Sequence, residues 1–297
     1  TLRPFASHNR NALSDKRLTI SYADAWNHLS ASDRQYDLIL LESPPPFTRH
    51  GAEMLTTDFF RLVRSRLSPG GLACQAISTA DLSTEMLGTV ARSFAALFPD
   101  VGAWWTGGFE ILLIGGMEPH MFDPDAAGVR MALPPVTEDL AGINITEPLG
   151  ILALYVTGRE AILSLGGGGS VNTVVNNRIA SRWPRQTLRP RRGDALGALN
   201  GLSVNPLAVV EPGGDDPDRY EGARERLESC AEARDLYLRS ANQVAAGSIM
   251  RGVSLLSEAV DTCRLNGILM FPLSEYYMLL SRRNMAAGRF EDAHALY

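Results

Sequence analysis

The stretch from Tyr36 to Gln75 constrains the fold of this chain more than any other part of the sequence. An apolar run from Leu38 to Leu41 ends in a carboxylate, Glu42, and three prolines follow at positions 44–46. A short apolar run bounded by breakers predicts a β-strand that is buried on both faces. In open α/β sheets, ligands bind beyond the carboxyl ends of such strands. Glu42 is therefore the first candidate for a functional group.

Strand and helix patterns alternate on both sides of this run. The predicted strands cover residues 17–25, 36–41, 72–77, 101–105 and 109–114, and the predicted helices cover 25–29, 57–67 and 83–98. Thr56 or Thr57 suits the N-cap of the helix at 57–67, and Thr106-Gly107-Gly108 predicts a hairpin-like turn. Such alternation predicts an α/β fold with a doubly wound, mainly parallel sheet and an antiparallel pair at one edge.

The remainder of the chain predicts a surface segment followed by helices. Residues 117–135 are rich in Pro, Asp and Gly, and 147–165 are predicted to be helical. The GGGGS run at 166–170 has the composition of a flexible hinge, either a natural loop or an introduced linker. Residues 211–218 predict another linker, and nearly everything after them is predicted to be helical. We expect three parts, 1–122, 123–210 and 211–297.

The last part contains a weak internal repeat. Ala245-Ala246-Gly247 recurs as Ala286-Ala287-Gly288, an interval of about 41 residues. Small residues such as Gly252 and Ala259 allow neighbouring helices to pack closely, as helix-pair solenoids require. The interval exceeds the roughly 34 residues of a tetratricopeptide unit. A tetratricopeptide-like region with an insertion is the preferred prediction, and a generic helical bundle is the alternative.

Composition and charge exclude some classes of function. The net charge of −5 argues against a nucleic-acid-binding protein, which usually has a basic excess. The three cysteines have no paired spacing, which predicts buried thiols in a reducing, cytoplasmic compartment. The five histidines are scattered, so we expect no metal site. No apolar run approaches the roughly 18 residues of a membrane span.

The ends of the chain indicate a piece of a longer protein. The sequence begins at Thr1 without a methionine and stops at Tyr297 within a helical pattern. Contact with a membrane is expected only if apolar segments precede Thr1. A protein partner of the helical repeats is also expected, because helix-pair arrays commonly present binding surfaces.

The first two-thirds of the chain resembles the spermidine synthase (polyamine aminopropyltransferase) family. The resemblance is strongest to a divergent bacterial branch that is fused to membrane segments or tetratricopeptide repeats. It rests on a set of short motifs spread over residues 5–190. These are Tyr36-Asp37-Leu38-Ile39, Glu42-Ser43, Pro46-Phe47, Gly51, Leu55-Thr56, Phe59-Phe60, Pro69-Gly70-Gly71, Gln75, the FEILLIGG strand at 109–116, Asn172-Thr173 and Pro184-Arg185.

The resemblance implies a domain like that of class I methyltransferases, using decarboxylated S-adenosylmethionine or S-adenosylmethionine as co-substrate. In that family the Gly-rich loop and the ribose-binding acid precede the strand that ends at Asp24. Two central strands of the sheet also lie in the part that this chain does not contain. We therefore expect these 297 residues alone to bind the cofactor poorly. Micromolar binding of decarboxylated S-adenosylmethionine would contradict this expectation.

The resemblance also assigns roles to individual residues. In aminopropyl transfer a small amine attacks the carbon beside a sulfonium, so a carboxylate is needed to accept the proton of the amine. Glu42 corresponds to the catalytic aspartate of the family. Asp24, with Ala25, corresponds to the position that binds the adenine amino group. Ser43 and Gln75 are the expected substrate contacts. Gln75 is expected to end its strand at the same edge of the sheet as Glu42, where a polar side chain often lines the pocket.

Several family acids are missing from this chain. The second acid of the catalytic strand end falls at Pro45, and the acids of the NTDD segment fall at Val174 and Val175. Asp58 and Glu53 are nearby acids that can substitute, although solvated surface charge is the preferred role for both. These departures favour the alternative of a catalytically idle scaffold that recruits a partner. An S-adenosylmethionine-dependent methyltransferase is a further alternative, because a fold does not fix the chemistry.

Structural roles compete with the functional ones at several positions. Asp24 can cap the helix that follows it, and Glu42 can be a strand-end acid that binds backbone N–H groups. Trp104 and Trp105 predict core packing, with a ligand platform as the alternative. The basic residues at 178–192 predict a solvated face, with anion binding as the alternative.

Overall fold

The computed structural model describes residues 11–42, 48–80, 82–143, 145–187, 194–210, 221–263, 281–282 and 284–289. These residues belong to two compact units, Thr1–Arg34 and Gln35–Tyr297. The structure shows a mixed α/β protein that is compatible with a methyltransferase-like fold. None of the described helices is both long and apolar enough to cross a membrane.

The first unit contains short helices and no described strand. A 3₁₀ turn covers Ala12–Ser14, and α1 covers Ala25–Ala31. The predicted strand at 17–25 is wrong, because residues 18–22 belong to no helix or strand and α1 begins at Ala25. A strand needs ladder hydrogen bonds to a neighbour, and the described part of this unit supplies none. The predicted helix beginning at Ala25 is confirmed.

The second unit is built on one mixed sheet. Its strands are β1 (Tyr36–Glu42), β2 (Leu67–Ser78), β3 (Asp100–Gly107), β4 (Glu110–Gly116) and β5 (Tyr155–Gly158), in the order β1-β2-β4-β3-β5. The β1–β2 pair is parallel, and the β2–β4, β3–β4 and β3–β5 pairs are antiparallel. Three strands, β1, β2 and β3, thus run in one direction. Within the described sheet, the expected parallel pairing is confined to β1 and β2.

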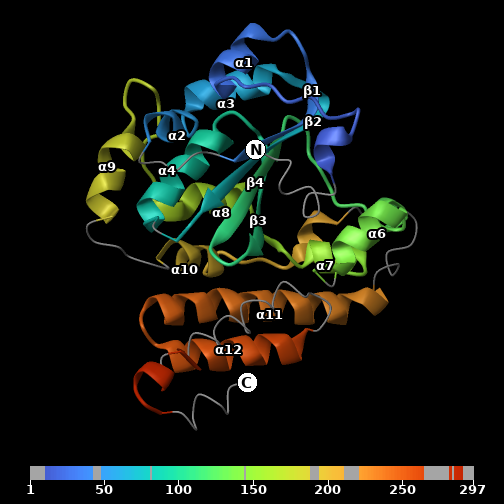
Figure 1. The fold of residues 1–297 in the computed structure, drawn as a ribbon, viewed down its shortest axis with the longest axis vertical. Helices are drawn as coiled ribbons and strands as arrows, with labels where there is room; N and C mark the ends of the chain where they lie inside the picture. The colour runs from blue at the N-terminus through green and yellow to red at the C-terminus, as the bar shows by residue number, and fades with distance from the viewer. Residues whose placement is uncertain are drawn as a thin grey trace. The chain divides into compact units, whose positions relative to one another are not determined.

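One face of the sheet is covered by helices that the sequence predicted. These are α3 (Thr57–Ser65) and α4 (Thr84–Ala95), capped by the side chains of Thr56 and Ser83, together with α8 (Arg159–Ser164) (Figure 1). Ile39 and Leu41 of β1 point to this face and are buried. This side of the sheet therefore follows the expected apolar pattern.

The opposite face of β1 is open in the described structure. The side chains of Leu38 and Leu40 are 57% and 64% exposed. The prediction that this strand is buried on both faces is therefore wrong. The physical reason is that β1 is an edge strand of the described sheet and buries only the face that holds Ile39 and Leu41.

The segment after β4 is more structured than its composition suggested. It forms α5 (Pro124–Met131), α6 (Pro134–Ala141), α7 (Pro148–Leu152), α9 (Arg178–Thr187), α10 (Asp194–Asn200) and two 3₁₀ turns, η3 (Leu165–Gly167) and η4 (Pro206–Val209). The helix predicted at 147–165 is wrong in its middle, where β5 pairs with β3. The aromatic and β-branched side chains of Tyr155, Val156 and Thr157 suit a strand.

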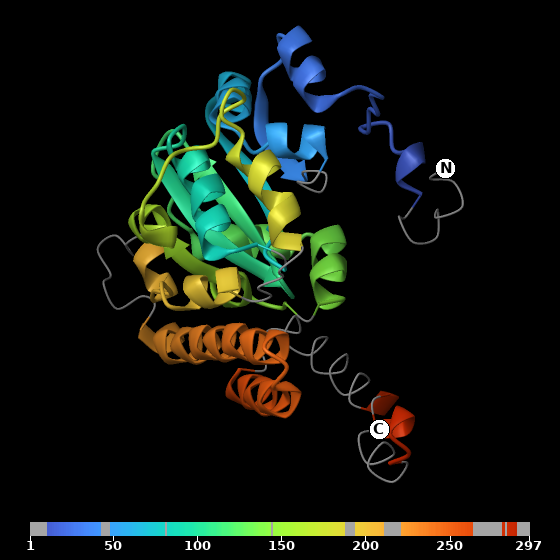
Figure 2. The same ribbon diagram turned by 90° about the vertical axis from the view of Figure 1, so that its left-hand side faces the viewer.

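Two long helices follow the predicted linker, which lies outside the described residues. Helices α11 (Glu221–Ala245) and α12 (Ile249–Thr262) lie side by side in both views (Figures 1 and 2). Gly252 of α12 permits this close packing, because a Cβ there would clash with Val244 Cγ2. The predicted close approach at this glycine is confirmed. The second copy of the repeat is described only in part, so the tetratricopeptide-like assignment stays a prediction.

The helix pair shares its core with the sheet. Buried residues of α11 and α12 form one apolar cluster with Trp105 of β3 and with residues of α7 and β5. Trp105 stacks against Tyr237 of α11 with ring centroids 4.2 Å apart. The three-part division of the chain remains a prediction, but this core is continuous from β3 to α12.

One disulfide corrects the cysteine prediction. Cys230 of α11 is bonded to Cys263, which directly follows α12. Cys74 is the buried free thiol, and burial raises its pKa to about 11. The sequence spacing of 33 residues carried no pairing signal, because the two cysteines meet only when α12 folds back along α11.

Candidate functional site

Glu42 is the last residue of β1, as the sequence predicted. It is exposed, and its backbone aligns with Ala76 of β2 in the parallel pair. Successive side chains of a strand alternate between the faces of a sheet, so Glu42 shares the open face with Leu38 and Leu40. A carboxylate in this position can accept a proton or bind a cationic group from solvent.

Gln75 of β2 lies next to the end of β1, but its side chain points to the other face of the sheet from that of Glu42. Its backbone pairs with Leu41, and its side chain is 0% exposed. The Nε2 group donates to the carbonyls of Ala76, at 2.8 Å, and Leu41, at 3.4 Å. Gln75 is also not a strand end, since β2 continues to Ser78. The structure thus does not bring the Gln75 and Glu42 side chains together, because the side chains of successive residue pairs point to opposite faces of the sheet.

The expected cofactor contact, Asp24, acts as a helix cap in this structure. Its carboxylate accepts a hydrogen bond from Asn27 N at 3.0 Å, at the start of α1, whose first residue is Ala25. This is the structural role that the sequence left open. Asp24 and Ala25 belong to the first unit and Glu42 to the second. Ser43 lies outside the described residues, and so does Pro45.

A buried asparagine organises the segment that resembles the family's NTDD motif. Asn172 Nδ2 donates to Leu55 O at 3.0 Å, and its Oδ1 accepts from Ile179 N at 3.3 Å. Its backbone N–H donates to Ser93 Oγ at 2.7 Å, and its carbonyl accepts from Thr57 N at 2.8 Å. Asn172 therefore joins the start of α3, helix α4 and the loop before α9. Its place in a family motif was the available signal for this role.

Asp58 has a structural role at the start of α3. Its Oδ2 accepts a hydrogen bond from Val174 N at 2.9 Å, and its Oδ1 lies 3.4 Å from Arg61 Nη1. Glu53 lies 3.8 Å from the imidazole of His50. These contacts involve protein groups, so neither acid needs a ligand to explain its position.

We expect Asp58→Ala to lower the free energy of unfolding by about 1 kcal/mol, because Val174 N loses its acceptor and α3 loses an N-terminal carboxylate. Asp58→Asn should cost less, since its amide oxygen can still accept that bond. Urea titration of both variants measures the difference. Equal stability of Asp58→Ala and the unmodified protein would contradict this role.

The loop at Val174 and Val175 has no carboxylates to offer a cation. Val175 is 99% exposed and Val174 is partly exposed, so apolar side chains occupy positions where the resemblance expects acids. Across the part of the chain that the structure describes, no group of three or more His, Cys, Asp or Glu side chains could hold a metal ion. Glu42 is thus the described carboxylate that best fits the expected chemistry.

The comparisons with known proteins bear on this region. Residues 2–107 match the spermine/spermidine synthase domain. The matched range includes Asp24, Glu42 and Gln75, and it ends with β3. The match includes the motifs between Tyr36 and Gln75, whereas the motifs at 109–116, 172–173 and 184–185 lie outside the matched range.

Individual relatives are similar at low identity. The chain is 28% identical over 115 residues to polyamine aminopropyltransferase 2 of Bacillus cereus, covering 35% of this chain and 31% of that protein. It is 31% identical over 71 residues to polyamine aminopropyltransferase 1 of Streptomyces coelicolor, covering 24% and 13%. It is 23% identical over 129 residues to a polyamine aminopropyltransferase of Saccharolobus islandicus, covering 41% and 43%. Each match spans less than half of the relative's length.

Proposed function

We propose that this chain forms part of a divergent spermidine synthase-like transferase. In the complete protein, an aminopropyl group would pass from decarboxylated S-adenosylmethionine to a small amine. Glu42 would accept a proton from the attacking amine, which a positioned carboxylate can do for a rate gain of about 10²–10⁴-fold. Asp24, Ala25 and Ser43 remain the proposed contacts to cofactor and substrate, whereas Gln75, which is buried on the other face of the sheet, is proposed to act indirectly.

The observation that carries this proposal is the match of residues 2–107 to the spermine/spermidine synthase domain, together with the exposed carboxylate at the end of β1. The carboxyl end of a strand is a common place for a catalytic group in α/β folds. Gln75 enters the proposal as a residue that fixes the end of β1 through Leu41 O.

Glu42→Gln in the complete protein tests the proposal. The amide keeps the size of the side chain but cannot serve as a base, so turnover should fall about 100-fold or more. The measurement is release of methylthioadenosine from decarboxylated S-adenosylmethionine with 1,4-diaminobutane as acceptor. Glu118→Gln, an exposed glutamate after β4, is the matched control and should retain turnover. If Glu42→Gln keeps full turnover, this residue is not the base.

A catalytically idle scaffold is the second candidate. It is favoured by exposed Val174 and Val175, where the resemblance expects acids. In that case the helices α11 and α12 would recruit a partner protein, and polyamine levels would not respond to Glu42→Gln. A methyltransferase activity is separated from aminopropyl transfer by its product, S-adenosylhomocysteine in place of methylthioadenosine.

A cytoplasmic location belongs to the same proposal. The observation against it is the Cys230–Cys263 disulfide, because structural disulfides are rare in reducing compartments. Oxidation state in the cell therefore bears directly on where the transferase works.

A further inference from the structure

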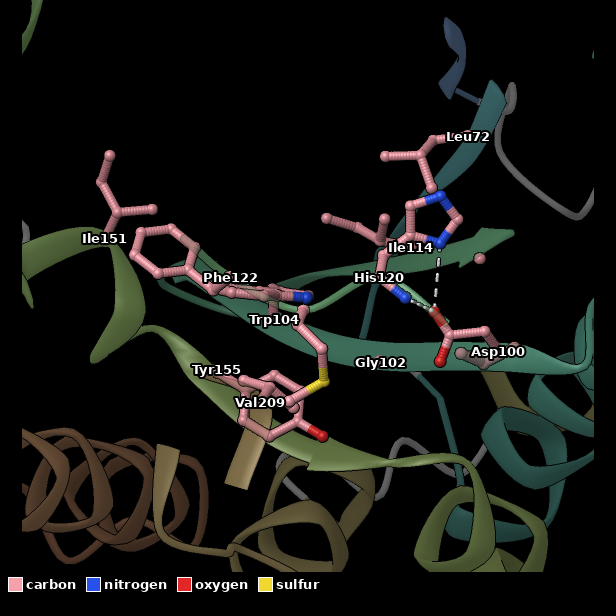
Figure 3. A pocket seen from close by; sticks show the side chains of 13 residues that line it. Leu72, Asp100, Gly102, Trp104, Ile114, His120, Phe122, Ile151, Tyr155 and Val209 are labelled. Atoms are coloured by element: carbon pink, nitrogen blue, oxygen red, sulfur yellow. Dashed lines mark hydrogen bonds and ion pairs between the residues drawn. The ribbon is translucent and has the colours of Figure 1, made fainter. Parts of the chain in front are cut away.

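A separate cavity lies on the open face of the sheet, away from Glu42. Its volume is about 330 Å³, which suits a small ligand. Strands β2, β3, β4 and β5 supply its floor, and residues 120–122, Ile151 of α7 and Val209 of η4 close it (Figure 3). Trp104 shares a rung of the sheet with Glu42 but lies three strands away, about 14 Å at the usual strand spacing.

Three aromatic side chains line this cavity. Trp104, Tyr155 and Phe122 come from β3, β5 and the segment before α5, and the Trp104 and Tyr155 rings meet edge to face at 5.2 Å. Gly102 keeps the space open, because a Cβ there would lie 3.0 Å from the Tyr155 ring. Trp105, the next residue of β3, is buried in the core instead. Trp105 thus packs in the core, as the sequence predicted, whereas Trp104 lines the cavity.

A carboxylate stands at the other end of the cavity. Asp100 Oδ2 accepts a hydrogen bond from His120 N at 2.9 Å and lies 3.2 Å from His120 Nδ1. Both contacts use the same oxygen, as Figure 3 shows, so among the described residues Oδ1 is available to a ligand. His120 Nε2 lies 3.5 Å from Gly70 O, which holds the ring from its other side.

The charge of the lining selects the class of ligand. The described lining contains Asp100 and His120 but neither lysine nor arginine. Burial, helped by the Asp100 carboxylate, raises the pKa of Tyr155 to about 12, so its phenol stays neutral at physiological pH. Aromatic faces and a carboxylate attract cations, whereas an anionic ligand would meet Asp100 without a fixed positive partner.

We propose that this cavity binds a small primary alkylammonium compound. The ammonium group donates to Asp100 Oδ1, and the alkyl chain lies against Trp104, Tyr155 and Phe122. The site is distinct from the proposed transfer site at Glu42, and it does not depend on transferase activity. It would give the protein a second place at which an amine is sensed or held.

The test uses the 297-residue chain and three probes of equal chain length, n-butylammonium, n-butanol and n-butyrate. Titration is followed by calorimetry and by the indole N–H resonance of Trp104. Butylammonium should bind saturably and at least about tenfold more tightly than butanol, because a charge-assisted hydrogen bond is added. Butyrate should not bind. Equal binding of butanol and butylammonium, or no saturable binding of butylammonium, overturns the proposal.

Two variants locate the site. Asp100→Asn removes the charge and Trp104→Leu removes the aromatic floor while leaving the Asp100–His120 contacts. Each should weaken butylammonium binding about tenfold or more. Asp37→Asn, an exposed aspartate of β1, and Glu42→Gln should bind as the unmodified chain does. If both Asp100→Asn and Trp104→Leu bind butylammonium with unchanged affinity, the ligand does not bind in this cavity. If Glu42→Gln loses binding, butylammonium binds at the transfer site and the proposal of a separate site is wrong.

Discussion

Replacing Arg234 with alanine is expected to lower the free energy of unfolding by about 3–5 kcal/mol. The side chain of Arg234 is 2% exposed, in the middle of α11. Its guanidinium Nη1 donates to the carbonyls of Ala153 and Tyr155, so the arginine joins α11 to the start of β5. Removing it leaves these buried carbonyls without their donor and also opens a cavity.

The rest of the Arg234 network offsets the cost of burying a charge. Nη2 donates to Ser203 Oγ at 2.5 Å, and Nε donates to Asp235 Oδ1 at 2.9 Å. Ser203 Oγ in turn lies 2.9 Å from both carboxylate oxygens of Asp235. Burial lowers the pKa of Arg234, and the neighbouring Asp235 carboxylate opposes that shift. The planar guanidinium donates to four acceptors at once, which an ammonium group cannot do with the same geometry.

Two further variants sharpen this prediction. Arg234→Lys keeps the charge but has a single nitrogen, so its stability should lie between those of the alanine variant and the unmodified protein. Arg239→Ala, an exposed arginine of the same helix, should change stability by no more than about 0.5 kcal/mol. Guanidinium titration followed by circular dichroism measures all three. If Arg234→Ala is as stable as Arg239→Ala, the arginine does not hold α11 on the sheet.

The predicted elements hold best where one local signal decides the structure. Helices α3 and α4 begin after Thr56 and Ser83 because a hydroxyl cap precedes an apolar stripe at helical spacing. The β3–β4 hairpin follows from its Gly107-Gly108 turn. The prediction for 17–25 was wrong, because strand propensity alone does not supply a pairing partner.

The candidate site was predictable in position but not in orientation. The apolar run before Glu42 correctly indicated a strand that ends at this carboxylate. Which face each side chain occupies depends on register, and the register pairs Gln75 with Leu41 and so separates it from Glu42. The sequence of one strand does not show this register, because the register depends on how the neighbouring strand pairs with it.

Features formed by distant segments gave no usable signal. The cavity between β3 and residues 120–122 depends on Asp100 and His120, which are 20 residues apart. The Arg234 network joins positions 153–155, 203 and 234–235. Single charged residues in such patterns are usually solvated, so sequence reasoning favours a surface role for each of them. Only the folded chain shows that these side chains meet.

The second large effect is expected from the bond between Cys230 and Cys263. Opening it should lower the free energy of unfolding by about 3–4 kcal/mol, because the unfolded chain regains the freedom of a long closed loop. The bond ties α11 to the residue that follows α12, so the end of α12 should loosen first. Cys74 is buried and distant in sequence, and its replacement by alanine should not change the response to reductant.

The measurement compares guanidinium unfolding with and without dithiothreitol. The unmodified chain and Cys74→Ala should both lose stability on reduction, whereas Cys230→Ser combined with Cys263→Ser should start at the lower value and not respond. Peptide mapping without reductant should recover the two cysteines in one linked peptide. Labelling of all three thiols in the unreduced, unfolded protein would show that the bond is absent. Because cytosolic thiols are kept reduced, the oxidation state of this pair in cells also decides between a cytoplasmic and an oxidising location.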